Sequence, residues 1–314
     1  MAQCGCDLHT YCMTASHLQQ HQADATKPTA RYLLPALLAC YLVWGSTYLA
    51  IRYALASFPP FFQMSTRFFV AGILLTVFMR LRCAPWPNVM HWRNAFVVGS
   101  LMLVGGMGLT GVASQTIGSG LIATFIAIVP MLVSAWGLLW GKRPNWMEIT
   151  GMAVGMLGLL LLVRGTSFTA SEVGLMAIVG ATTLWSLGSV LQTTSLPLAQ
   201  GPMGFASEML CGGAVLMLIS VILGEQFVWP PRPLAAAAWA YLVLFGSLVA
   251  FSACLYLLAH ASPAIAPSYA FVNPLIALFL GIVLAGEVVT KSEWMASTVI
   301  LGGVLLIFAG KTKS

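Results

Sequence analysis

The stretch Trp44-Gly45-Ser46-Thr47-Tyr48 decides the fold of this chain, because a related stretch, Trp185-Ser186-Leu187-Gly188-Ser189, lies 141 positions further on. Arg67 and Glu208 keep the same offset, although their charges are opposite. Self-similarity at a fixed offset is typical of an internally duplicated architecture. Other pairs keep a similar offset along the chain: Gly72 with Gly213, Gly99 with Gly246, Pro130 with Pro274, and Glu148 with Glu293.

The composition points to a membrane protein. Of the 314 residues, 59% are hydrophobic and only 7% are charged, whereas a soluble domain has about 25% charged residues. So much apolar surface cannot be packed into an aqueous core without large exposed patches. The net charge is +6, but no basic face or motif accompanies it, so nucleic acid is not an expected partner. The expected partner is the lipid bilayer.

Ten segments have the roughly 20 apolar residues that a helix needs to cross a membrane. All ten are expected to be helices, because a backbone facing lipid must satisfy its own hydrogen bonds. The sequence therefore predicts an all-α membrane protein with ten transmembrane helices, arranged as two inverted five-helix repeats. The segments are roughly 33–56, 61–81, 93–114, 118–140, 146–164, 172–194, 203–224, 234–259, 265–285 and 292–310.

The orientation follows from the lysines and arginines, which gather on the cytoplasmic side of membrane proteins. With the N-terminus inside, nine of the 14 face the cytoplasm, three face out, and Arg52 and Arg67 lie within spans. Both termini are then cytoplasmic. Five spans per repeat make the second copy enter the membrane inverted. The predicted parts are a disordered cytoplasmic leader (1–31), a first repeat (32–164) and a second repeat (172–310).

The seven cysteines do not suggest a disulfide framework. Cys40, Cys83, Cys211 and Cys254 lie in or beside apolar segments and are expected to be small packing residues. In the leader, Cys4, Cys6, Cys12, His9, His17 and His21 allow a metal role, but their spacing fits no tight ligand pattern. A disordered tail, or translation that starts at Met13, is the alternative. We expect no metal and no cofactor.

Two prolines fall near the middle of related spans. Pro130 and Pro274 each remove a backbone donor, so that the carbonyls of Ile126 and Ala270 lose their usual partners. Broken helices at related places in two halves are the best sequence indication of a transporter's binding site. The alternative is a kink that only shapes packing, since proline is frequent in membrane helices.

Aromatic and polar residues near these positions are candidates for a binding cavity. Trp44 and Trp185 lie well inside their spans, where a buried indole N–H needs either a cavity or a protein partner. Tyr269 and Asn273 are four residues apart and share a helix face, although Asn273 could instead bond to a neighbouring helix. The predicted substrate-binding residues are Trp44, Thr47, Tyr48, Pro130, Trp185, Ser189, Tyr269, Asn273 and Pro274.

Arg67 and Glu208 are the predicted gating or coupling residues. Each lies about six residues into its span, from opposite faces, hence ~9 Å deep at 1.5 Å per residue. In a core of ~30 Å this leaves roughly 12 Å between them, too far for an ion pair. Embedded charges are functional by default. Arg67 could instead extend its side chain to the interface. Glu208 could couple protons or make a structural hydrogen bond.

Glycines repeat along one face of the fifth span, at Gly151, Gly155 and Gly158. Small residues at this spacing let two helices approach closely. The partner helix is expected to belong to the same chain, with a dimer interface as the alternative.

Several of these motifs together resemble the EamA family of the drug/metabolite transporter superfamily, over nearly all of 33–310. The resemblance is closest to a subgroup of bacterial inner-membrane transporters, and it implies ten helices, two EamA repeats and efflux of amino acids or related metabolites and drugs. The first half has Gly141-Lys142 where the family has Gly-Glu, which weakens any shared role for that position. The motifs are Trp44-Gly45-Ser46-Thr47-Tyr48, Arg67-Phe68, Pro130, Ser262-Pro263-Ala264, Ser268-Tyr269-Ala270, Asn273-Pro274 and Gly286-Glu287.

These observations predict a secondary transporter that exports amino acids or related small metabolites or drugs by alternating access, with proton coupling at Glu208 as a candidate mechanism. The expected location is the bacterial inner membrane, with a small-molecule substrate, and the protein would be a monomer or homodimer. An intramembrane enzyme is a weaker alternative, since no span contains Asp and no H-E-x-x-H exists. A channel or structural membrane protein is the other alternative.

Overall fold

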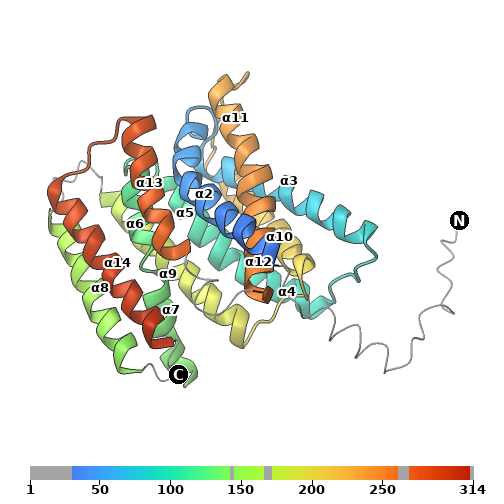
Figure 1. Cartoon of the computed structure of the whole chain (residues 1–314). Helices are drawn as coiled ribbons and strands as arrows, with labels where there is room; N and C mark the ends of the chain where they lie inside the picture. Colours follow the sequence, from blue (N-terminus) through green and yellow to red (C-terminus); the bar gives the residue numbers. More distant parts are fainter. Residues whose placement is uncertain (1–29, 142–144, 166–171, 261–268, 312–314) are drawn as a thin grey trace, which may run out of the picture.

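The computed structural model describes residues 30–141, 145–165, 172–260 and 269–311, and within these ranges every regular element is a helix (Figure 1). The predicted leader (1–31), with its candidate metal ligands, lies almost wholly outside the described residues. The elements are α2 (Ala30–Ala54), α3 (Pro60–Leu81), α4 (Val89–Gly99), η1 (Ser100–Gly108), α5 (Leu109–Ala113), α6 (Ser119–Ile126), α7 (Val129–Gly137), η2 (Leu138–Trp140), α8 (Trp146–Gly165), α9 (Glu172–Thr194), α10 (Pro202–Ile222), α11 (Pro233–Tyr241), η3 (Leu242–Val249), α12 (Ala250–His260), α13 (Tyr269–Ala285) and α14 (Lys291–Lys311).

Several of these elements join into rods that can cross a bilayer. Within the described ranges, 7 helical segments are long and apolar enough to span a membrane, and α13 contributes a shorter apolar helix, Val272–Ala285. The chain is therefore an all-helical, multi-pass membrane protein, as the sequence predicts. The count of ten spans and their inversion stay predictions. The 7 segments are Tyr32–Ala54, Pro60–Leu81, Val89–Ala113, Ser119–Trp140, Glu172–Thr194, Pro202–Ile222 and Pro233–Cys254.

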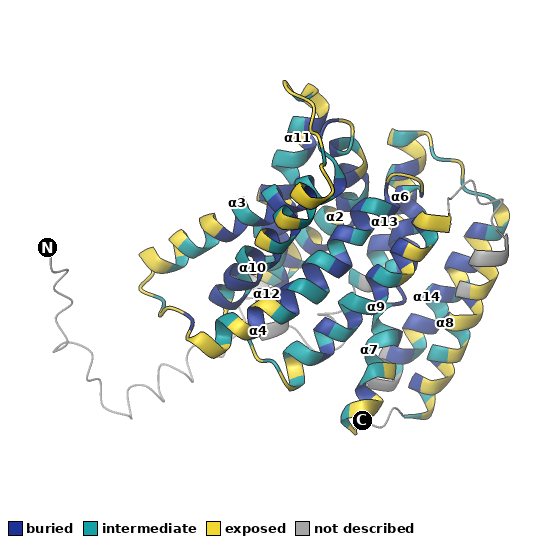
Figure 2. Ribbon diagram, turned by 180° about the vertical axis from the view of Figure 1, so that it is seen from behind, coloured by how far each residue is buried: buried dark blue, intermediate teal, exposed yellow. Residues whose placement is uncertain are grey.

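Burial follows the expectation for a bundle in lipid. Figure 2 shows buried positions where helices meet and exposed positions along their outer faces. Many of the exposed side chains are large and apolar, such as Phe78, Val221 and Phe279. In a bilayer these faces lie against acyl chains, so their exposure carries no penalty.

The span that contains Pro130 is broken, whereas the span that contains Pro274 is not. The helix α6 ends at Ile126 and α7 begins at Val129, and the turn between them is closed by Ile128 N–H donating to the carbonyl of Phe125 at 3.1 Å. The expected interruption at Pro274 is wrong, because α13 runs through this residue without a break. A proline deletes a single ladder bond, a loss that membrane helices tolerate.

Two π-helical segments, η1 and η3, lie at related places in the two halves. Such segments are frequent at functional sites, because they widen the helix and re-aim its side chains. The segment η1 includes Leu103 and Met107, and the segment η3 includes Ser247. All three of these residues reappear at or beside the cavity described below.

The glycine face of α8 packs against α14, so internal packing holds and no second copy is needed to explain it. A Cβ on Gly303 would lie 2.6 Å from the backbone nitrogen of Gly155, and a Cβ on Gly151 would lie 2.6 Å from the carbonyl of Gly303. Backbone therefore meets backbone, as in small-residue interfaces of membrane helices. The two helices run side by side along one flank of the molecule (Figure 1).

The matched pair Glu148 and Glu293 is explained by helix capping. The Glu148 carboxylate accepts from Asn145 N–H at 3.2 Å, and the Asn145 side chain accepts from Glu148 N–H at 2.9 Å. Glu293 and Thr290 form the same reciprocal arrangement at the start of α14, at 2.7 and 3.3 Å. Both are capping boxes, which accounts for the matched positions of the two glutamates without a functional role.

Candidate functional site

A cavity of about 160 Å³ lies inside the bundle, between helices of both halves. The first half contributes side chains from α2, α3, η1, α6 and α7, and the second half contributes from α9, α12 and α13. The lining residues are Trp44, Thr47, Tyr48, Arg67, Phe68, Leu103, Met107, Ala123, Ile126, Ala127, Val129, Pro130, Trp185, Phe251, Tyr269, Asn273 and Pro274. Six of the seventeen are aromatic, so the wall is mostly apolar.

The structure brings the sequence-predicted binding residues together. Of the nine, only Ser189 lies outside the cavity wall. Its hydroxyl donates to the carbonyl of Trp185, one turn away, at 2.8 Å. The break between α6 and α7 also reaches the cavity, since Ala127 and Pro130 line it. Apolar lining residues such as Phe68 and Phe251 were missed, because an apolar residue in a membrane helix carries no distinguishing sequence signal.

Aromatic contacts set the shape of the cavity on the α2 side. The Trp44 ring makes edge-to-face contacts with Tyr269, at 4.8 Å between centroids, and with Phe251, at 5.5 Å. These rings come from α2, α13 and α12, so they join the two halves. Within the described residues, neither the Trp44 nor the Trp185 indole N–H has a hydrogen-bond partner. Of the two sequence interpretations, cavity lining is the one that the geometry supports.

The polar residues in the wall are held differently. The hydroxyl of Thr47 donates to the carbonyl of Val43 at 2.8 Å, within its own helix. With its amide nitrogen turned toward the backbone, Asn273 donates to the carbonyls of Tyr41 at 3.3 Å and Tyr269 at 3.2 Å. Asn273 therefore does both things that the sequence allowed: it lines the cavity and it ties α13 to α2. Thr47 and Asn273 remain as acceptors that a solute can reach.

Arg67 is fully enclosed, with 2% of its surface exposed, and does not extend to the membrane interface. Its Nε donates to the Ser247 hydroxyl at 2.8 Å, and its guanidinium lies 5.0 Å from the centroid of the Phe68 ring. A Cβ on Gly246 would lie 3.0 Å from Nη2, so this glycine makes room for the guanidinium. The side chain thus crosses from α3 to η3 and forms part of the cavity wall.

Glu208 occupies the related place in the other half but does not line the cavity. It is also 2% exposed, and a Cβ on Gly99, which the duplication matches to Gly246, would lie 3.4 Å from its Cγ. Its Oε2 is buried with no hydrogen-bond partner in the described part of the chain. The structural hydrogen bond that sequence reasoning left open is therefore not found there. Its role in gating or coupling stays a prediction.

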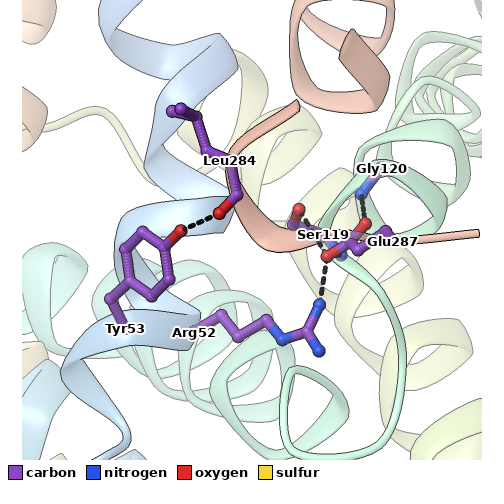
Figure 3. A network of polar contacts seen from close by, with 6 residues as sticks. All are labelled: Arg52, Tyr53, Ser119, Gly120, Leu284 and Glu287. Atoms are coloured by element: carbon purple, nitrogen blue, oxygen red, sulfur yellow. Dashed lines mark hydrogen bonds and ion pairs between the residues drawn. The ribbon is translucent and has the colours of Figure 1, made fainter. Parts of the chain in front are cut away.

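Arg67 and Glu208 do not pair, and the ion pair found among the described residues is elsewhere. Arg52 near the end of α2 pairs with Glu287, which follows α13 (Figure 3). The same carboxylate accepts from Ser119 N–H at 2.8 Å, from Ser119 Oγ at 2.9 Å and from Gly120 N–H at 3.2 Å. Three elements of the bundle, α2, α6 and α13, are thus joined at one end by a single carboxylate.

This cluster, which we call the Glu287 cluster (Arg52, Ser119, Gly120 and Glu287), was missed by sequence reasoning. A carboxylate at a helix N-terminus satisfies N–H groups that have no partner in the helix and lies at the positive end of the helix dipole. Beside it, the Tyr53 hydroxyl donates to the carbonyl of Leu284 at 2.8 Å (Figure 3). The available signals were Glu287 in a family motif and Arg52 within a span, but nothing in the sequence connected them.

The residues that the structure describes contain no group of three or more His, Cys, Asp or Glu side chains that could hold a metal ion. Cys40 and Cys254 are buried next to Leu257 in an apolar cluster, in line with packing roles. Cys83, in contrast, is exposed.

The comparisons with known proteins agree with this architecture. A model of the EamA-like transporter family matches residues 32–164 and 172–309. The inner membrane transporter YedA of Escherichia coli (strain K12) is 40% identical over 285 residues, which cover 90% of this chain and 93% of YedA. Protein PecM of Dickeya dadantii (strain 3937) is 24% identical, with 84% and 88% covered.

Among solved structures, one crystal structure of a protein is similar to this chain with a TM-score of 0.62. It is 19% identical in sequence, and the match covers 89% of this chain and 98% of the other. At that identity the likeness concerns the fold alone.

Proposed function

The chain belongs to the EamA-like transporter family, and from this membership we propose that it is a secondary transporter that exports small organic solutes. The observation that carries the proposal is the cavity, which takes its wall from both matched halves of the chain. A solute site between two related halves is the arrangement expected for alternating access. Amino acids and related metabolites or drugs are the proposed solute class.

The proposed mechanism is a rocking motion of the two repeats, ten helices in all, around the fixed cavity. Eight of the predicted binding residues would contact the solute: Trp44, Thr47, Tyr48, Pro130, Trp185, Tyr269, Asn273 and Pro274. The turn between α6 and α7 supports this role, since non-helical backbone at membrane depth is tolerated where it lines a cavity. Ser189 would act indirectly, by bonding to the carbonyl of Trp185.

The two ends of the path would close differently. At one end, the Glu287 cluster ties the end of α2 and the segment after α13 to the start of α6. With the N-terminus inside the cell, this is the outer end. Opening toward the outside then requires the carboxylate to release α6. Glu208, buried in the other half, is the proposed proton-coupling group, because it is a carboxyl within a span and its Oε2 has no hydrogen-bond partner among the described residues.

The proposed location is the bacterial inner membrane, with both termini in the cytoplasm and the protein acting as a monomer or homodimer. The relative YedA is named as an inner membrane transporter, and the positive-inside distribution of lysine and arginine supports this orientation. The name of YedA is that of a transporter, which favours transport over catalysis.

The experiment is solute flux into proteoliposomes that contain the purified chain. We expect saturable, counterflow-stimulated uptake of at least one amino acid or small metabolite, and loss of uptake in a Trp44→Ala, Trp185→Ala double variant that still elutes as a monodisperse protein. Uptake that rises linearly without saturation would instead indicate a channel. Full uptake in the double variant would remove the cavity from the pathway.

A further inference from the structure

The Arg67 guanidinium is a buried cation that has no counter-ion among the described residues. It lines the cavity, and its contacts are the Ser247 hydroxyl at 2.8 Å, the Phe68 ring and, weakly, the Met64 sulfur at 3.9 Å. A charge held in a low-dielectric environment needs an opposite charge and hydrogen bonds to offset the loss of water. One neutral hydroxyl and one ring face satisfy only part of a group that carries five N–H donors.

Among the residues that the structure describes, no carboxylate fills this gap. The protein has eight Asp and Glu residues, and the two aspartates, Asp7 and Asp24, lie in the leader. Among the glutamates in the described ranges, Glu287 pairs with Arg52, and Glu225 accepts from the N-terminal N–H groups of α3. Glu148 and Glu293 cap their own helices.

Two glutamates remain. Glu208 packs on Gly99 and is absent from the cavity wall. Glu172 is exposed in the first turn of α9 and is likewise absent from the cavity wall. The ion pair of Arg52 with Glu287 is the salt bridge found in the described residues. The described residues therefore supply no anion for Arg67, which leaves the solute as the candidate source of one.

We propose that Arg67 binds the carboxylate of the transported solute, and that the solute is a small monocarboxylate with an apolar ring, for which an ammonium group is not required. The inference rests on the proposed function and specifies the solute class. A guanidinium is suited to this task because its planar N–H fork matches a carboxylate with two parallel hydrogen bonds. Ser247 is then a positioning residue, since its bond to Nε leaves both terminal nitrogens available to the solute.

The rest of the wall fits the apolar part of such a solute. Aromatic side chains from both halves, including Trp44, Trp185 and Phe251, surround the space. Its volume is about 160 Å³, close to the ~150 Å³ of an engineered apolar cavity that admits benzene. A smaller cavity of about 60 Å³ shares Tyr48 and Trp185 with it but does not include Arg67. The guanidinium and the aromatic side chains thus line one cavity, which offers both a charged and an apolar surface to such a solute.

The same wall disfavours cations. None of the described lining residues is a carboxylate, so a solute whose only charge is an ammonium would meet the Arg67 charge with no opposite charge to offset it. Like charges in a desolvated site repel strongly. Cationic drugs are accordingly poor solutes for this cavity, although they belong to the wider class that the family resemblance implies.

The test is calorimetric titration of the full-length protein in nanodiscs with four probes of matched size or charge. The probes are 3-phenylpropionate, its neutral amide 3-phenylpropanamide, the cation 3-phenylpropylamine, and acetate, which carries the charge without the ring. We expect 3-phenylpropionate to bind at least 10-fold more tightly than the other three. A carboxylate that forms charge-assisted bonds to a guanidinium loses about 10- to 100-fold in affinity without them.

Variants separate anion binding from a structural role. Arg67→Gln should remove the preference for 3-phenylpropionate over the amide, whereas Arg67→Lys should keep a reduced preference, because the charge remains but the fork is lost. Arg52→Gln, which alters an arginine outside the cavity wall, should leave the preference unchanged. The ratio of carboxylate to amide affinity is the readout, because a variant that is only less stable would weaken both probes equally.

Each outcome has a distinct meaning. Equal affinity for acetate and 3-phenylpropionate would reduce the site to a general anion site and overturn the ring part of the proposal. An unchanged carboxylate preference in Arg67→Gln, tighter binding of 3-phenylpropylamine, or no binding of 3-phenylpropionate would overturn the proposal itself. Flux in proteoliposomes that does not depend on solute charge would leave the transporter function intact while removing this inference. Carboxylate binding without flux would support anion binding at Arg67 and contradict the transporter function.

Discussion

The Glu287 cluster allows a quantitative prediction about opening at the predicted outer end. Glu287→Ala removes three acceptor contacts, with Ser119 N–H at 2.8 Å, Ser119 Oγ at 2.9 Å and Gly120 N–H at 3.2 Å. Hydrogen bonds to a charged group contribute about 1.5–3 kcal/mol each. Counting the two short bonds at the lower value gives a loss of about 3 kcal/mol. The ratio of closed to open molecules should then fall about 100-fold.

The ion pair itself should contribute less. The Arg52 side chain is 42% exposed, against 9% for Glu287, and exposed pairs contribute only about 0.2–1 kcal/mol. Arg52→Gln should therefore shift the same ratio by less than about 5-fold. Glu287→Gln should fall between the two, because it keeps acceptor oxygen but loses the charge. The predicted order of effect is Glu287→Ala, Glu287→Gln, then Arg52→Gln.

The assay is alkylation of a cysteine placed in the cavity wall. Thr47→Cys, in a background with the seven native cysteines replaced by serine, is exposed to a membrane-impermeant maleimide from the outer face of oriented vesicles. The alkylation rate reports the open fraction and should rise in the predicted order. Glu293→Gln is the matched control, because Glu293 caps α14 away from the cavity. Equal rates in Glu287→Ala and the control would refute the reasoning.

Three further predictions follow from contacts elsewhere. Gly303→Ala should destabilise the protein by about 1–3 kcal/mol, as overpacking does. Gly302→Ala should not, since a Cβ at Gly302 meets nothing within 4 Å. Thermal unfolding of the two variants tests this, and equal unfolding midpoints would contradict it. Ser247→Ala should weaken 3-phenylpropionate binding 2- to 10-fold by removing one bond to Arg67, as measured by the same titration. Glu208→Gln should abolish flux driven by a proton gradient while leaving solute binding intact; unchanged gradient-driven flux in proteoliposomes would exclude Glu208 as the coupling group.

The helical membrane class and much of the cavity could be predicted from the sequence, because both depend on patterns that repeat. Length, apolar content and charge placement are sufficient to identify the spans. Trp44 and Trp185 stood out because an indole deep in a span needs an explanation, and their shared offset pointed to one place in both halves. Pro130 was informative for the same reason, and it lies beside a real break in the helix.

The parts that sequence reasoning missed depend on geometry that no local pattern encodes. The Glu287 cluster joins residues 168 and 235 positions apart, so its existence follows only from how three helix ends meet. The break expected at Pro274 failed because one lost hydrogen bond does not end a helix that its neighbours support. The place of Arg67 in the cavity wall depended on the direction of its side chain across to Ser247, and its predicted role in gating or coupling stays a prediction.

The Glu287 cluster also makes the two ends of the proposed transport path unequal. The duplication would match Arg52 and Glu287 with Thr193 and Lys142, which cannot form an ion pair. Two matched ends would give a carrier the same half-saturating solute concentration on both faces of the membrane. The Glu287 cluster stabilises closure at one end and has no matched counterpart in the other half of the sequence. The two half-saturating concentrations should therefore differ, in a ratio set by the free energy of one carboxylate. Such a carrier is kinetically asymmetric even when no gradient drives it.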